Sequence, residues 1–246
     1  MRELNITIDK KNIGYLHYLK NNISNLKLKL YTAVCEINDM AVLSMAVKDE
    51  DFVSIQNKLK QFISEVVLFV YKEEYLQQHI DFSKLKDDYQ LALLKALVLF
   101  DSESDKQFIK QRISLEHDIY LDSFYHFKLQ PLQKRWSEFV SLTNENGNLL
   151  ESEAFLDLLK FLIATIKPKT NLVHVYYNGG VFEYKDKNQK PIKSNFIQRN
   201  NDEANLITTL ITLAPNNITL HCIDAITNNT FKVLYYIFDK KINLLV

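Results

Sequence analysis

The stretch NLVHVYYNGGVFEYKD, residues 171–186, decides how the last part of this chain folds. Apolar and polar side chains alternate on both sides of the Asn-Gly-Gly sequence at 178–180, which is the pattern of two β-strands. The glycines supply the positive φ angles that a tight turn requires. The stretch therefore predicts a hairpin. Because neighbouring strand residues point to opposite faces, it also predicts that His174 and Tyr176 share a face.

The segments on either side of the hairpin predict a mixed sheet covered by helices. A helix is expected over about 151–166, and another begins near residue 203 and stops at Pro215. The strand NITLHCI, the helix TFKVLYYIF and the strand INLLV follow in that order. The last two strands are joined by a helix, so we expect them to be parallel neighbours.

The first eighty residues have a different pattern. ELNITI alternates as a strand, a helix is expected over about 12–26, and two strands flank the turn pair Asn38-Asp39. An amphipathic helix follows the acidic residues 49–51. Residues 82–142 are expected to be helical, with one helix running from Asp105 to Phe124 and a break before Pro131.

Together these predictions give an α+β fold. We expect an N-terminal β-α-β-β-α unit at 1–80, a helical segment at 81–148 and a C-terminal mixed α/β sheet unit at 149–246. The three parts can form one compact assembly.

Composition limits the classes of function. The 246 residues carry 30 basic and 30 acidic side chains, so no overall charge attracts nucleic acid or an anionic membrane. Four glycines cannot build the common phosphate-cradling loops, and no Cys/His cluster indicates a zinc site, so no cofactor or metal is expected. Cys35 and Cys222 are interpreted as buried, reduced thiols. The N-terminus lacks an apolar leader and no apolar run approaches the ~20 residues of a membrane span, so we expect a cytoplasmic protein.

Three groups of polar residues are candidate sites, and each has a structural interpretation. His221 and Cys222 are strand neighbours on opposite faces, so we expect a buried cysteine opposite a half-exposed histidine rather than a nucleophile. His117 and Asp118 are expected on a helical turn that lacks a second metal ligand at position 121. His126 is expected to pack among aromatic side chains. An enzyme centred on His126 or His174 is the weakest alternative.

The segment after the hairpin is locally basic. It contains only one acidic residue, Asp186, and the following five basic residues: Lys185, Lys187, Lys190, Lys193 and Arg199. A solvated turn is the favoured interpretation. With the nearby tyrosines, the alternative is a surface that binds phosphates or single-stranded nucleic acid.

Three stretches resemble the YtxC-like family, which is linked to sporulation. LITTLITLAPNNITLHCIDAITNNTFKVLYYIF, residues 206–238, is similar to the family's helix, strand and closing helix, and His221 falls on the family's histidine. Residues 153–192 resemble its helix followed by a hairpin. DSFYHFKL, residues 122–129, resembles its GF-x-x-FR-L element with Phe124 and Phe127 retained, whereas Lys128 replaces the arginine.

The resemblance implies a cytoplasmic, sporulation-associated protein and no reaction. The leading hypothesis is therefore a non-enzymatic interaction or scaffold protein that binds a protein partner. The alternative is nucleic-acid or phospholigand binding through the basic segment 185–199. The sequence leaves the oligomeric state open.

Overall fold

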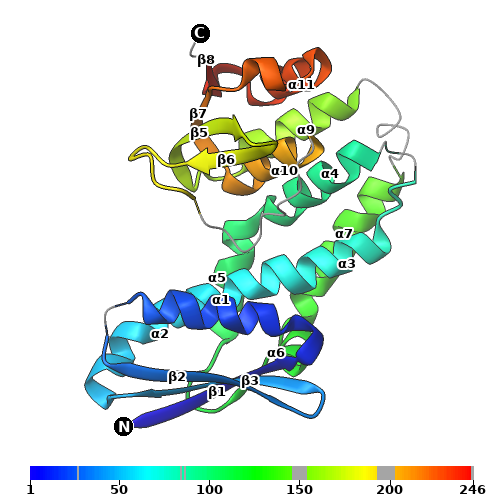
Figure 1. The fold of residues 1–246 in the computed structure, drawn as a ribbon. Coiled ribbons are helices and arrows are strands. Elements are labelled where there is room, and N and C mark those ends of the chain that lie inside the picture. The colour runs from blue at the N-terminus through cyan, green and yellow to red at the C-terminus, as the bar shows by residue number, and fades with distance from the viewer. Residues whose placement is uncertain (27, 84, 86, 146–153, 193–202, 245–246) are drawn as a thin grey trace. The chain divides into compact units, whose positions relative to one another are not determined.

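A computed structural model describes residues 1–26, 28–83, 85, 87–145, 154–192 and 203–244 (Figure 1). It confirms the predicted α+β fold, with two separate mixed sheets and many helices. The chain forms two compact units. The N-terminal unit contains residues 1–74 and 103–138, and the C-terminal unit contains residues 75–102 and 139–246. The division at 1–80, 81–148 and 149–246 remains a prediction.

The sheet of the N-terminal unit has the strand order β2-β3-β1-β4. Its strands are β1 (Arg2–Asp9), β2 (Leu30–Ile37), β3 (Met40–Val47) and β4 (Ile119–Tyr120). β3 pairs antiparallel with β1 and with β2, and Asn38 takes a positive φ in the turn between β2 and β3. β4 pairs in parallel with β1 through Ile6 and Ile119. The predicted N-terminal order of strands and helices is therefore confirmed.

Helices cover one face of this sheet. The helical segments of the unit are α1 (Ile13–Ser24), α2 (Asp49–Val66), η2 (Val67–Lys72), the start of α3 (Glu73–His79), α5 (Ser102–Arg112), α6 (Leu121–Ser123), η3 (Phe124–Lys128) and most of α7 (Gln130–Glu145). α1 packs against α2, β2 and β3, as Figure 1 shows. The core between them is made of fully buried aliphatic side chains such as Ile6, Leu16, Leu43 and Leu59. η2 and η3 have π-helical geometry.

The helix predicted from Asp105 to Phe124 is shorter in the structure. α5 ends at Arg112, residues 113–118 form a loop, and Ile119 joins the sheet. Asp118 accepts hydrogen bonds from the Asn5 backbone N–H at 2.8 Å and from Asn5 Nδ2 at 3.1 Å. His117 and Asp118 therefore lie on a loop and not on a helical turn, because a backbone partner on β1 outweighs the local helical pattern.

The sheet of the C-terminal unit has the order β6-β5-β7-β8. Its strands are β5 (Thr170–Asn178), β6 (Val181–Lys185), β7 (Pro215–Leu220) and β8 (Ile242–Leu244). β5 and β6 form the predicted antiparallel hairpin, and β7 is parallel to both β5 and β8, so the predicted parallel neighbours are confirmed.

The helices of this unit pack against one another and cover the sheet. In the described ranges, the α-helices that lie wholly within this unit are α4 (Asp87–Leu99), α9 (Ala154–Thr165), α10 (Glu203–Leu213) and α11 (Asn228–Phe238). α10 connects the hairpin to β7, and α11 connects β7 to β8. Each connection therefore adds the next strand on the same side of the sheet. Connections between parallel strands are right-handed in nearly all proteins, and two successive connections in the same direction then place both helices on the same face of a sheet. On the other face, the described side chains of β5, such as His174 and Tyr176, are half-buried.

Candidate functional site

The hairpin of β5 and β6 places its side chains in two distinct environments. Gly179 and Gly180 take φ angles of +58° and +84° in its turn, so the chain reverses without strain. On one face, Val173 and Val175 are fully buried with the β7 residues Ile218 and Leu220. On the opposite face, His174, Tyr176 and Lys185 are half-buried. We call this opposite face the outer face of the C-terminal sheet.

Four side chains on the outer face form a continuous stack, which we name the outer-face cluster: His174, Tyr176, Lys185 and His221. His174 Nδ1 lies 3.0 Å from Nε2 of His221. The His221 ring stacks on Tyr176, with ring centres 4.2 Å apart and planes 9° apart. Lys185 Nζ lies 4.7 Å from the centre of the Tyr176 ring. Cation–π and stacking contacts therefore join groups from three chain segments.

The strand register explains why these residues meet. His174 lies opposite Lys185 in the antiparallel pair, and opposite Thr219 in the parallel pair with β7. Just after β7, the backbone N–H of His221 donates to the carbonyl of Val175 at 2.9 Å. This hydrogen bond brings His221 beside both His174 and Tyr176.

The surroundings of His221 favour its neutral form. Desolvation, and then the neighbouring His174, lower the pKa of His221 below its usual value. In a neutral pair, one ring nitrogen donates its proton and the other accepts it. The pair can take up one extra proton and keep its hydrogen bond. A second proton would place two positive charges and two N–H donors face to face, which is unfavourable.

The basic segment after the hairpin begins with an ordered loop. Asp186 Oδ1 accepts hydrogen bonds from the backbone N–H groups of Asn188 at 2.8 Å and Lys190 at 2.9 Å. These backbone hydrogen bonds, that of Lys190 first, lower the pKa of Asp186. The Tyr176 hydroxyl donates to Gln189 Oε1 at 3.0 Å, so the loop is tied back to the cluster.

The structure brings together some predicted site residues and separates others. Lys185 and His221 join in the outer-face cluster, whereas Lys187 and Lys190 are exposed on the loop. Lys193 and Arg199 lie outside the described residues. His221 is half-exposed and Cys222 is buried, as expected. The sequence analysis missed the contact between His174 and His221, because 47 positions separate them and only the strand register reveals it.

The DSFYHFKL element contributes a second set of contacts, in the N-terminal unit. Asp122 accepts a hydrogen bond from the Tyr71 hydroxyl at 2.9 Å and another from the Asp9 backbone N–H at 3.0 Å. Tyr125 stacks on Tyr71 with ring centres 4.7 Å apart. Burial, and then the Asp122 carboxylate, raise the pKa of Tyr71. The interior of this element thus joins the π-helical segments η2 and η3.

The residues of this element that the sequence analysis singled out have different surroundings. Phe124 is half-buried, whereas Phe127 is 73% exposed and Lys128 is also exposed. His126 is exposed too, but its ring centre lies 5.0 Å from that of Tyr125, so it contacts an aromatic side chain at the surface and is not buried. In the π-helical geometry of η3, Tyr125 is the aromatic side chain that turns inward.

A buried ionic group lies nearby in the N-terminal unit. Lys72 Nζ is 2.9 Å from Asp105 Oδ2, and Trp136 Nε1 donates to the same oxygen at 3.1 Å. Arg135 Nη2 lies 3.3 Å from the other oxygen, Oδ1. The group links η2, α5 and α7, and its hydrogen bonds satisfy the buried carboxylate.

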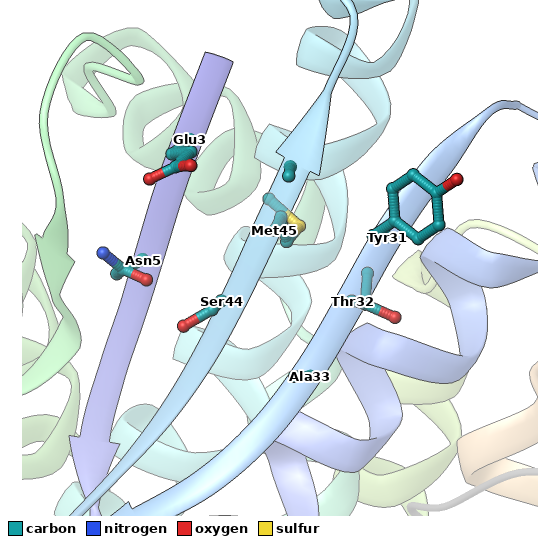
Figure 2. Close-up of a pocket in the computed structure, with 8 residues that line it drawn as sticks. Glu3, Asn5, Tyr31, Thr32, Ala33, Ser44 and Met45 are labelled. Carbon is teal, nitrogen blue, oxygen red and sulfur yellow. The ribbon is translucent and has the colours of Figure 1, made fainter. Parts of the chain in front are cut away.

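A hollow of about 330 Å³ lies on the face of the N-terminal sheet away from α1 (Figure 2). Its polar side chains are Glu3 and Asn5 from β1, Ser44 from β3, and Tyr31 and Thr32 from β2. No histidine, cysteine, lysine or arginine lines it. The hollow can accept hydrogen bonds from a ligand, but it has no nucleophile paired with a base.

Other expectations can also be compared with the described residues. No group of three or more histidine, cysteine or acidic side chains in this part of the chain is arranged to hold a metal ion. None of the helices in the described ranges has both the length and the apolar character needed to cross a membrane. Both cysteines are free, but only Cys222 is buried. Cys35 is exposed because it lies on the same face of β2 as the exposed residues Tyr31 and Ala33, so the prediction of two buried thiols was wrong for Cys35.

The comparisons with known proteins give the family. The YtxC-like family matches residues 53–243, which is most of the chain and includes both the outer-face cluster and the DSFYHFKL element. The chain belongs to the YtxC-like family. Membership in the YtxC-like family suggests a sporulation-related protein. No curated protein and no solved structure matches the chain.

Proposed function

We propose that this chain is a cytoplasmic binding protein of the sporulation programme, without a reaction of its own, and that it recognises a protein partner through the outer-face cluster. The single observation that carries this proposal is the stack of His174, Tyr176, Lys185 and His221 on a sheet face. Tyrosine is among the residues that contribute most to binding energy at protein interfaces.

Preorganisation supports the proposal. Tyr176 lies in contact with His221 and Lys185, and its hydroxyl donates to Gln189. The two-glycine turn and the Asp186 loop fix the hairpin that carries it. A side chain held in place before binding loses little conformational entropy on binding, so more of its contact energy appears as affinity.

Recovery of partners from sporulating cells tests this proposal. The tagged full-length chain, Tyr176→Ala and Tyr235→Ala are compared under the same conditions. Tyr235 is a matched control because it is an exposed tyrosine of the same unit, on α11. We expect a partner that co-purifies with the wild type and Tyr235→Ala, and that is lost with Tyr176→Ala. Equal recovery with Tyr176→Ala, with folding verified by circular dichroism, would exclude the outer-face cluster as the binding surface.

Phospholigand or nucleic-acid binding is a second candidate function, and the ordered loop favours it. Lys187 and Lys190 are exposed there. The carboxylate of Asp186, the loop's acidic residue, accepts hydrogen bonds from backbone N–H groups. Such binding should weaken as salt increases, and changing Lys187 and Lys190 to glutamate should weaken it further. Fluorescence anisotropy with a labelled single-stranded oligonucleotide measures both effects. Affinity that responds to neither change would exclude this candidate.

A further inference from the structure

The facing nitrogens of His174 and His221 converge on one point of the outer face. At 3.0 Å the two nitrogens share one hydrogen bond, so neither nitrogen is available to a ligand. If both rings are protonated, both nitrogens become donors, and the shared hydrogen bond is lost. An oxygen atom that accepts from both nitrogens can then replace it, once the rings have moved apart.

The charges around the histidine pair determine whether it favours an anion or a cation. Lys185 Nζ is held over Tyr176, which is itself stacked on His221, so a permanent positive charge lies one ring away from the pair. This charge disfavours a metal cation between the imidazoles and favours an anion. Glu183 opposes this effect, because its carboxylate lies 3.8 Å from Lys185 Nζ.

We propose that His174, His221 and Lys185 form a binding site for a terminal phosphate group, and that the phosphate is bound together with protons. The two imidazolium N–H groups and the lysine ammonium then donate to phosphate oxygens. A terminal phosphate carries up to two negative charges, which complement this set of cations better than the single charge of a phosphodiester. The inference rests on the outer-face cluster being the binding surface.

Among the described residues, β6 and the loop after it contribute the other charged groups near the site. β6 contributes Glu183, and the loop contributes Asp186, Lys187 and Lys190, while β5 contributes the titratable Tyr176. Asp224 follows His221 by three positions, in the short 3-10 helix Ile223–Ala225, and is exposed. The Asp186 carboxylate accepts backbone hydrogen bonds, so Glu183 is the competitor in contact with Lys185.

Sulfate and phosphate titrations of the purified full chain, followed by NMR of the histidine ring protons, test the proposal. Sulfate remains a dianion from pH 5.5 to 7.5, so its pH dependence reports protonation of the protein. We expect sulfate to bind about tenfold or more tightly at pH 5.5 than at 7.5, since one proton taken up changes affinity by up to tenfold per pH unit. Bound anion should also raise the pKa of His221.

Conservative variants separate this site from non-specific anion binding. His174→Gln and His221→Gln should each reduce the pH dependence, because one titratable imidazole remains, and the double variant should abolish it. Lys185→Met should weaken binding at both pH values. Glu183→Gln should strengthen it. His126→Gln and Lys167→Met, which replace exposed residues elsewhere, should behave as the wild type. Anion binding that is absent at about 50 mM, or that does not depend on pH or on either histidine, would overturn the proposal.

Two further measurements identify the ligand class. A 5′-phosphorylated mononucleotide should bind more tightly than a dinucleotide whose only phosphate is internal, and the reverse order would overturn the choice of a terminal phosphate. Zinc that binds the pair in place of sulfate at pH 7.5 would overturn the choice of an anion. Phosphate binding without any partner recovered from cells would support the site and contradict only the proposed protein-binding function.

Discussion

Lys72 Nζ lies 2.9 Å from Asp105 Oδ2 inside the N-terminal unit, and each side chain is only 4–5% exposed. Trp136 and Arg135 approach the same carboxylate. Asp105 therefore accepts from two cationic side chains and from the Trp136 indole. Its removal would leave the Lys72 charge buried without that carboxylate, which costs more than the pair itself contributes.

Replacing Asp105 with alanine should lower the free energy of unfolding by about 3–5 kcal/mol. Urea unfolding followed by circular dichroism measures the change. Glu50→Ala is the matched control, because Glu50 forms an exposed ion pair with Lys48 at 3.3 Å, and its loss should cost about 1 kcal/mol or less. If Asp105→Ala were as stable as Glu50→Ala, the buried ionic group would not stabilise the unit.

Local sequence signals predicted most of the fold. The hairpin at 171–186 follows from strict alternation and the glycines at 178–180, both of which are properties of a few neighbouring residues. The parallel pairing of β7 and β8 follows from the helix between them. The same reasoning failed for Ile119 and Tyr120, where a two-residue strand is stabilised by β1, more than a hundred positions away.

The candidate site could be predicted only in part. That His174 and Tyr176 share a face follows from strand alternation. The addition of His221 depends on the register of β5 with β7, which the sequence pattern does not specify. Asp186 looked like an isolated acidic residue in a basic segment, yet it organises the loop through backbone N–H groups. Asp followed two positions later by Asn is a turn signal that could have indicated this role.

The turn of the hairpin should not tolerate a side chain at Gly180. Its φ of +84° is costly for an L-residue, so Gly180→Ala should lower the free energy of unfolding by about 1–2 kcal/mol. Gly14→Ala in α1 is the control, because a Cβ there meets nothing within 4 Å and alanine favours helix. Gly14→Ala should be neutral or stabilising. Thermal denaturation measures both variants, and equal shifts of the melting temperature in the two would contradict the expectation.

The Asp186 loop should lose order in acid. Backbone hydrogen bonds from Lys190 and Asn188 lower the pKa of Asp186 below its unfolded value of about 3.9. The stabilisation is therefore complete above about pH 4 and is lost as pH falls through the lower pKa of the folded state. NMR shifts of the two backbone N–H groups should report this loss. Asp186→Asn, which still accepts but does not titrate, should remove the transition, whereas Asp224→Asn should retain it.

The two cysteines should differ in reactivity. Cys35 is exposed on β2, whereas burial raises the pKa of Cys222 to about 11. Because the thiolate is the reactive form, iodoacetamide at pH 8 should modify Cys35 first and leave Cys222 unmodified while the protein stays folded. Mass spectrometry of time points resolves the two sites, and Cys35→Ser should abolish the early modification. Comparable rates at both thiols would contradict the burial of Cys222.

The way the chain passes between its two units constrains the order in which it can fold during synthesis. The N-terminal unit needs residues 103–138, and β1 has no parallel neighbour until Ile119 has been made. Residues 75–102 belong to the C-terminal unit, whose sheet begins only at Thr170. On the ribosome, neither unit can complete its core from a continuous early segment. Helix α4, with apolar side chains such as Leu93 and Leu97, must therefore wait for α10 to emerge.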